Sequence, residues 1–271
     1  MDFFSEYISP FILAILQGLT EFLPVSSSGH LVLLNSIFPF DMGIVFDLVL
    51  HLATLLSVVA FYRKDIADIC IGCVKEVKNG KEKPNLKLVA GLLLATCLTG
   101  TIGLLLNDYV ENTFRSALVV GILLIFNAGI LWLSQKKGCF NLAPNGDLNF
   151  KTAAIIGVVQ GLAVLPGISR SGSTITAALL LGIRSEDCAK ISFLLSIPVI
   201  LGAAVLHLPD LAEVEGVHYG VIGAAALVAS IVGYISLVLL NKILKKARFY
   251  RFAPYCFVVG VVAIIGYCVF C

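Results

Sequence analysis

Long apolar stretches with few charges alternate with short polar segments along the whole of this 271-residue chain. Six stretches approach the ~20 residues that a helix needs to cross a bilayer. They lie at 44–62, 88–106, 116–134, 191–207, 219–240 and 254–270. Two further apolar stretches, 8–38 and 152–183, are each interrupted by a segment rich in Pro, Ser and Gly. The pattern predicts six transmembrane helices and two interrupted segments whose halves are too short to cross.

The two interrupting segments are copies of one another. Residues 17–30 align without a gap on residues 160–173 at an offset of 143 positions. The identical pairs are Gln17/Gln160, Gly18/Gly161, Leu19/Leu162, Ser26/Ser169, Ser28/Ser171 and Gly29/Gly172. A chain that repeats itself at about half its length is predicted to be duplicated. We expect a single membrane domain over 1–271, with one repeat over about 8–134 and the other over about 152–270.

Composition agrees with this interpretation. Hydrophobic residues make up 59% of the chain and charged residues 13%, whereas soluble domains carry about 25% charged residues. The sequence therefore predicts an all-α integral membrane protein surrounded by membrane lipids. The net charge of +2 does not indicate a nucleic-acid partner.

Lys and Arg predict the orientation, because cytoplasmic segments carry the excess of these residues. Segment 63–87 holds seven, segment 241–251 holds five and segment 135–151 holds three, so all three are expected inside. The acidic segment 208–218 and residues 1–7 hold no Lys or Arg and are expected outside.

The number of spans between these segments then fixes the two interrupted stretches. Segment 152–183 enters and leaves on the cytoplasmic face, and segment 8–38 enters and leaves on the opposite face. The sequence thus predicts an inverted-topology repeat with two re-entrant helical hairpins and six transmembrane helices.

The two copies differ where chemistry is expected. Glu21 faces Val164, Ser27 faces Arg170 and His30 faces Ser173. A charge at the bilayer centre costs about 2.5–3.5 kcal/mol, so Glu21 and Arg170 need each other, a bound ion or water. One polar pocket shared by the two hairpins satisfies this requirement.

This pocket is expected to bind an anion. The first half-helix is predicted to end at Leu23–Pro24 and the second to begin near His30. A helix start presents unpaired N–H groups and a positive dipole end, and Arg170 adds a planar fork that suits phosphate oxygens. The candidate substrate-binding residues are Gln17, Ser26, Ser169, Ser171, Ser173 and Thr174.

The candidate catalytic residues are Glu21, Ser27, His30 and Arg170. Glu21 would orient or deprotonate the nucleophile, His30 would act as acid or base, and Ser27 would be a nucleophile or a donor to the substrate. Simpler alternatives are a structural Glu21–Arg170 pair, a backbone-bonded histidine and serines that cap helices. Asp47 and His51 lie four residues apart on the first full span and are kept as supporting candidates.

Three segments resemble a known family. Glu-Phe-Leu-Pro-Val-Ser-Ser-Ser-Gly-His at 21–30, Pro-Gly-Ile-Ser-Arg-Ser-Gly-Ser-Thr at 166–174 and Phe-Leu-Leu-Ser-Ile-Pro at 193–198 are similar to the undecaprenyl-diphosphate phosphatases, the bacitracin-resistance family. The resemblance implies hydrolysis of undecaprenyl (polyprenyl) diphosphate to the monophosphate, which recycles the lipid carrier of cell-wall synthesis and confers bacitracin resistance. It also implies a pocket that opens to the outer side of the bacterial inner membrane. The family's functional groups fall on Glu21, Ser27, His30, Ser169, Arg170 and Thr174.

The resemblance further implies a divalent cation, Mg²⁺ or Ca²⁺. Members often carry Glu where this chain has Gln17, and an amide offers an oxygen ligand but no second negative charge. The expected metal ligands are therefore Glu21 and the Gln17 carbonyl.

A different class of function also fits the repeat. Inverted repeats with broken helices are typical of secondary carriers, so a polyprenyl-phosphate flippase or an anion transporter is the alternative. The Glu–Ser–His group occurs in only one copy, which favours an enzyme. The sequence leaves the oligomeric state open, a homodimer included.

Overall fold

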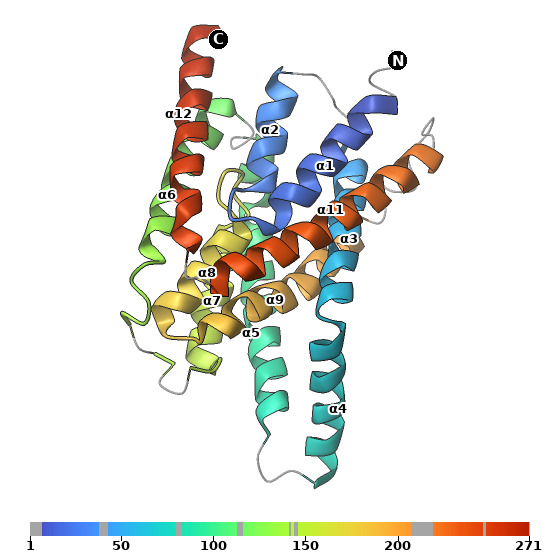
Figure 1. The fold of residues 1–271 in the computed structure, drawn as a ribbon, viewed down its shortest axis with the longest axis vertical. Coiled ribbons are helices and arrows are strands. Elements are labelled where there is room, and N and C mark those ends of the chain that lie inside the picture. The colour runs from blue at the N-terminus through green and yellow to red at the C-terminus, as the bar shows by residue number, and fades with distance from the viewer. Residues whose placement is uncertain are drawn as a thin grey trace.

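The computed structural model describes residues 7–37, 43–79, 83–112, 116–140, 142–143, 146–207, 219–245 and 248–270. Within these ranges the chain forms eleven α-helices, one 3-10 helix and no strand (Figure 1). The helices are α1 Ser9–Phe22, α2 Ser27–Ile37, α3 Gly43–Phe61, α4 Arg63–Asn79, α5 Pro84–Asn112, α6 Ala117–Leu133, α7 Phe150–Leu162, α8 Arg170–Leu181, α9 Ser185–Leu206, α11 Tyr219–Lys245, η2 Phe249–Phe252 and α12 Ala253–Phe270.

Four helical segments in the described part of the chain are long and apolar enough to cross a membrane. They are Pro84–Leu106, Ser185–Leu206, Tyr219–Lys245 and Phe249–Val269, and they coincide with four of the six expected spans. Helices α3 and α4 pass the same test only as a pair bent by 70°. The remaining expected span is α6, an apolar helix of 17 residues. The protein is therefore a multi-pass helical membrane protein with four such segments, or five if the bent pair is one span.

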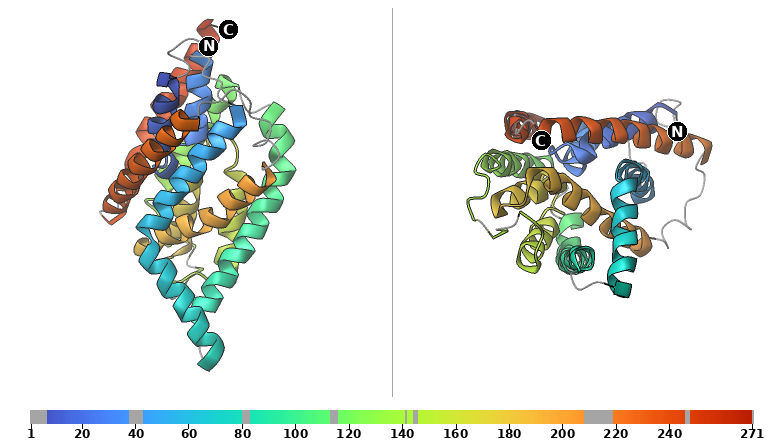
Figure 2. Two further views of the ribbon diagram at one scale, coloured as in Figure 1. Left: turned by 90° about the vertical axis from the view of Figure 1, so that its right-hand side faces the viewer. Right: turned by 60° about the horizontal axis from the view of Figure 1, so that its bottom comes forward.

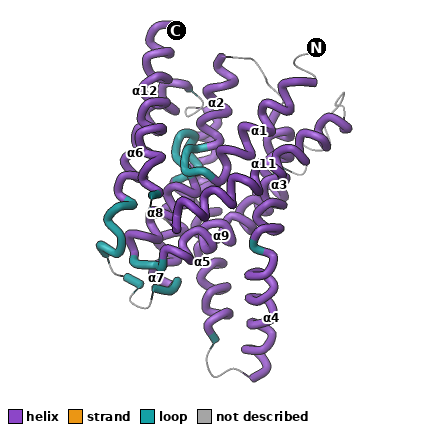
Figure 3. Tube along the Cα trace, in the orientation of Figure 1, coloured by secondary structure: helices purple, strands orange, loops and turns teal. Residues whose placement is uncertain are grey.

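The duplicated motif folds as two helical hairpins. Helices α1, α2, α7 and α8 have 14, 11, 13 and 12 residues, and at about 1.5 Å per residue each is shorter than the hydrocarbon core of a bilayer. In Figure 1 the α1–α2 hairpin lies above the α7–α8 hairpin. The loops that connect the two helices of each hairpin lie together in Figure 3, where loops are teal.

Each hairpin packs against a long helix of the other half of the chain. Helix α1 lies along α11, and α7 lies along α5. A Cβ atom on Gly18 would lie 2.8 Å from the carbonyl oxygen of Ala229, and one on Gly161 would lie 2.7 Å from Cβ of Ile102. Gly18 and Gly161 are equivalent positions of the repeat, so both copies use a glycine for the same close approach.

The start of α2 corrects one expectation. Helix α2 begins at Ser27 and not near His30. Ser26 adopts a left-handed φ of 70°, and its hydroxyl accepts the N–H of Gly29 at 3.2 Å, so the helix is capped one turn earlier. The equivalent Ser169 accepts the N–H of Gly172 at 3.1 Å. The repeated Ser-x-x-Gly is therefore a helix cap in both copies.

The basic segment 63–87 folds largely as helix. Helix α4 and the adjoining part of α5 extend beyond the rest of the molecule in Figure 1 and in the left view of Figure 2. The carboxylate of Glu76 accepts the backbone N–H groups of Asn85 and Leu86, each at 2.9 Å, and so caps α5. Residues 1–6 and 208–218, on which the expected orientation partly rests, lie outside the described residues.

The glycine contact between α1 and α11 yields a test of the packing. We expect Gly18→Ala to lower the free energy of unfolding by about 1–3 kcal/mol, because the new methyl group overpacks the contact. Gly129→Ala on α6 is the matched control, since nothing lies within 4 Å of its new Cβ. Alanine favours a helix over glycine by about 1 kcal/mol, and this gain applies to both variants. Thermal unfolding in mild detergent measures both variants, and equal melting temperatures would contradict the packing.

Candidate active site

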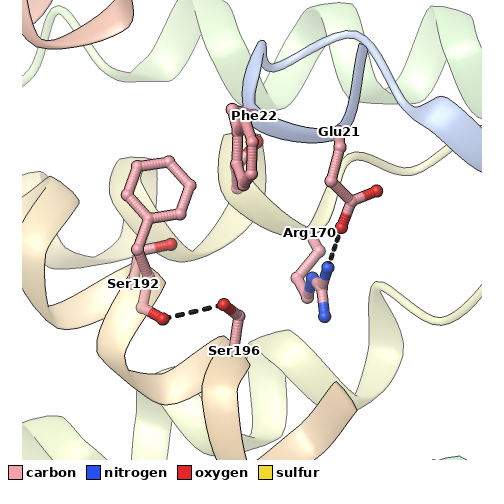
Figure 4. Close-up of a pocket in the computed structure, with 7 residues that line it drawn as sticks. Glu21, Phe22, Arg170, Ser192 and Ser196 are labelled. Atoms are coloured by element: carbon pink, nitrogen blue, oxygen red, sulfur yellow. Dashed lines mark hydrogen bonds and ion pairs between the residues drawn. The ribbon is translucent and has the colours of Figure 1, made fainter. Parts of the chain in front are cut away.

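The Glu21 carboxylate is the centre of the site. Glu21 lies in the last turn of α1, and its side chain is 3% exposed. Its Oε2 accepts the Ser27 hydroxyl at 2.7 Å and the Gln17 amide N–H at 3.0 Å. Its Oε1 accepts from Nη2 of Arg170, in the first turn of α8 (Figure 4). The carboxylate therefore has hydrogen-bond donors from both hairpins.

The Glu21–Arg170 ion pair joins residues 149 positions apart. An isolated charge away from water is strongly disfavoured, and an opposite charge with good hydrogen bonds offsets that penalty. The Arg170 side chain is 24% exposed, so the protein encloses it only in part. The expected meeting of the two motifs is thus found, and Gln17 and Ser27 of the first motif bond to the same carboxylate.

His51 of α3 also faces this carboxylate. Its Nε2 lies 3.6 Å from Oε2 of Glu21. Its Nδ1 lies 2.8 Å from the carbonyl oxygen of Asp47, and because a carbonyl only accepts, Nδ1 carries a proton. His51 is one of the supporting candidates of the sequence analysis, because it is a titratable side chain within an apolar span.

His30 is bonded to other groups. Its Nδ1 donates to the carbonyl oxygen of Ser26 at 2.8 Å, and its Nε2 accepts the Tyr255 hydroxyl of α12 at 2.9 Å. The two rings are stacked, with centroids 5.7 Å apart. This geometry matches the alternative of a backbone-bonded histidine. Acid–base work by His30 stays a prediction and requires its Nε2 to leave Tyr255.

Three candidate serines hold the hairpin loops. The Ser26 hydroxyl accepts the N–H of Gly167 at 3.0 Å, in addition to capping α2. Ser169 Oγ lies 3.2 Å from Ser171 Oγ, and Ser171 donates to the carbonyl of Leu23 at 3.4 Å. Their roles in substrate binding stay predictions, since these hydroxyls already bond within or between the loops.

The last two candidate substrate-binding residues, Thr174 and Ser173, differ in their hydrogen bonding. The Thr174 hydroxyl lies 2.8 Å from the carbonyl oxygen of Arg170 and 2.6 Å from Oγ of Ser192. The Ser173 hydroxyl is buried without a hydrogen-bond partner in the described structure. Thr174 therefore connects α8 to α9, whereas Ser173 retains unused bonding capacity.

A small pocket lies against the ion pair (Figure 4). It is lined by Glu21, Phe22, Arg170, Ser171, Ser192, Phe193 and Ser196. The rings of Phe22 and Phe193 pack edge to face, with centroids 5.4 Å apart, and form its apolar wall. Sequence reasoning missed Ser192 and Ser196, whose signal was two hydroxyls four residues apart on one face of a helix. The guanidinium and the hydroxyls can donate hydrogen bonds to phosphoryl oxygens. The carboxylate beside them can accept a proton.

The donors around Glu21 also bear on the implied cation. No three His, Cys, Asp or Glu side chains in the described ranges form a metal cluster. However, Oε1 of Gln17 is buried without a hydrogen-bond partner there. One carboxylate and one amide oxygen fit a hard cation that completes its shell with phosphate oxygens and water.

The fold and the site together define a helical membrane protein with a carboxylate–guanidinium site where two hairpins meet. The chain belongs to the family described as bacitracin resistance protein BacA, whose profile matches residues 10–262.

Several curated relatives are similar over nearly their whole length, and each is named undecaprenyl-diphosphatase. The protein of Desulforapulum autotrophicum is 42% identical, covering 94% of this chain and 96% of the relative. That of Alcanivorax borkumensis is 41% identical, covering 94% and 97%. That of Methanosphaera stadtmanae is 38% identical, covering 96% and 98%.

A double-substitution cycle tests the ion pair. We expect Glu21→Gln to lower the free energy of unfolding by about 1–3 kcal/mol, because it leaves Arg170 without its partner. Arg170→Gln should act similarly, and the double variant should be more stable than the sum of the two losses predicts. Unfolding in mild detergent measures the coupling. Strictly additive losses would show that the two charges do not stabilise each other.

Proposed function

We propose that this protein is an integral membrane phosphatase that hydrolyses undecaprenyl diphosphate to undecaprenyl phosphate and phosphate. The observation that carries the proposal is Arg170 beside Glu21 at a hydroxyl-lined pocket. Membership of the family and the names of the relatives support the same reaction. The product would return to cell-wall synthesis as the lipid carrier, and removal of the diphosphate fits the bacitracin resistance in the family's name.

Arg170 and the start of α8 would bind the terminal phosphoryl group. Arg170 contacts Glu21 through Nη2, and its planar fork carries further N–H donors that match phosphoryl oxygens. The N-terminus of α8 adds the positive end of a helix dipole. Stabilisation of the charge on the transferring group is the main source of catalysis in phosphoryl transfer.

Ser27 and Glu21 would activate the nucleophile. The Ser27 hydroxyl already donates to Glu21 Oε2 at 2.7 Å, so the carboxylate is placed to take a proton from Ser27 or from a water beside it. Attack on the terminal phosphorus breaks its bond to the bridging oxygen, which leaves with undecaprenyl phosphate. If Ser27 attacks, water then hydrolyses the phosphoserine. His30, once released from Tyr255, would protonate the leaving phosphate or act as the base.

A divalent cation, Mg²⁺ or Ca²⁺, would be held by Glu21 and the buried Oε1 of Gln17. When bound, it would neutralise charge on the diphosphate oxygens. In the structure Gln17 donates its amide N–H to Glu21 at 3.0 Å, so its amide would have to rotate to turn Oε1 towards a cation shared with the carboxylate. The chain itself offers one negative ligand here, so the substrate would supply much of the cation's coordination.

We infer that the six expected spans and the two hairpins form an inverted repeat in the bacterial inner membrane, with the site open to the outer side. The short hairpin helices, the meeting of their loops and the exchanged packing of α1 on α11 and α7 on α5 support this arrangement. The lipid substrate would then reach Glu21 within the membrane.

The packing of each hairpin against a long helix of the other half of the chain also favours the alternative of a polyprenyl-phosphate flippase or an anion transporter. The two proposals predict different results for purified protein. Phosphate released in detergent indicates an enzyme, whereas tracer exchange across sealed vesicles without hydrolysis indicates a carrier.

Replacement of Arg170 tests the proposed reaction. We expect Arg170→Ala to lower phosphate release from undecaprenyl diphosphate by about 100-fold or more, because the transition state loses its main positive donor. Arg184→Ala is the matched control, since Arg184 pairs with Asp147 and Asp187 on an exposed surface. Both variants must elute as folded protein. Substantial turnover by Arg170→Ala would overturn the role of Arg170.

The metal requirement has its own test. We expect a chelator to abolish phosphate release and added Mg²⁺ or Ca²⁺ to restore it. Gln17→Glu should lower the cation concentration needed for half-maximal activity, because it adds a second carboxylate beside Glu21. Gln160→Glu, at the equivalent position of the other copy, should leave that concentration unchanged. Full activity in the chelator would contradict the cation site.

A further inference from the structure

Asn127 is a buried polar residue within an apolar helix. It lies in α6, whose other residues are aliphatic, aromatic or glycine, and its exposed fraction is 0%. Sequence reasoning did not single it out, and its signal was an amide in the middle of an apolar span. A buried amide in such surroundings is costly unless its hydrogen bonds are made.

Both ends of the Asn127 amide are bonded to the hairpin loops. Its Nδ2 donates to the carbonyl oxygen of Pro24 at 3.1 Å, and its Oδ1 accepts the backbone N–H of Ser169 at 3.0 Å. Nδ2 also lies 3.5 Å from Sγ of Cys256 on α12. The carbonyl can only accept and the N–H can only donate, so these partners fix the orientation of the amide.

The two bonded groups stand next to the proposed catalytic residues. Pro24 lies midway between Glu21 and Ser27 along the chain, and Ser169 directly precedes Arg170. One planar amide therefore bonds both to the loop between Glu21 and Ser27 and to the loop that leads to Arg170. A second link, the Ser26 hydroxyl to the N–H of Gly167, joins the same loops.

We propose that Asn127 is a positioning residue, which holds the two hairpin loops in the register that places Arg170 and Ser27 on the Glu21 carboxylate. It acts through the backbone of both loops and touches none of the reacting groups. This inference rests on the proposed phosphatase function, because it assigns Asn127 a part in that reaction.

The test compares Asn127→Leu with wild type and with a matched control. Leucine keeps the branching of the side chain at Cγ and removes both hydrogen bonds. We expect kcat for phosphate release from undecaprenyl diphosphate to fall by about 10- to 100-fold, and KM to change by less than about threefold, since a small misplacement of reacting groups acts on the transition state. Asn241→Leu is the control. Asn241 of α11 bonds to the Leu237 carbonyl and to the Tyr62 hydroxyl, away from both loops. The kcat of the Asn241→Leu variant should stay near that of wild type.

Four outcomes would overturn the proposal. The first is a folded Asn127→Leu protein with wild-type kcat. The second is a rise in KM alone, which would place Asn127 in substrate binding. The third is a loss of kcat that Asn241→Leu matches, which would make the effect general to buried asparagines. If Asn127→Leu does not fold, Asn127→Ala takes its place. The fourth outcome is that neither variant folds, which would make Asn127 a residue of fold stability only. Absence of phosphate release by wild type in the same assay would instead refute the proposed function.

Discussion

The ion pair between the Glu21 carboxylate and the Arg170 guanidinium joins the two hairpins and constrains the helices around them. Neither charge is stable alone in apolar surroundings, so each constrains where the other can lie. Glu21 lies in the last turn of one hairpin helix and Arg170 begins another, and their contact requires the two loops to meet. Helix termini also leave backbone groups unpaired. The loops must therefore be surrounded by polar partners even though the helices around them are apolar.

Those partners come from several helices. Serines at equivalent positions of the repeat cap α2 and α8, and Asn127 of α6 bonds to one backbone group in each loop. Glycines let α1 and α7 approach the long helices of the opposite halves. The same scaffold is thus used twice, and its packing and capping positions are those at which the two copies agree.

The residues of the proposed chemistry lie where the copies disagree. Glu21, Ser27 and His30 belong to one copy and Arg170 to the other. A symmetric carrier needs equivalent groups on both sides of the membrane, whereas a hydrolase needs a base and an anion-binding group at one place. The position of Ser27 on the carboxylate favours the hydrolase. His51 extends the group around Glu21, while His30 is held by Tyr255.

The helical class, four full-length spans, the short halves of the motif and the meeting of Glu21 with Arg170 could all be predicted from the sequence. These follow from local composition, from repetition and from the cost of an unpaired charge, all of which can be evaluated along the chain. Which other side chains surround the site depends on how the helices pack in three dimensions. His51 reaches the carboxylate from α3, Tyr255 binds His30 across 225 positions, and Asn127 bridges loops that lie 103 and 42 positions away. Their partners come from helices distant in the sequence, and no local pattern encodes which helix faces of a membrane bundle pack together. The start of α2 was misplaced for a related reason, because the left-handed turn at Ser26 is held by hydrogen bonds that include one to the other hairpin.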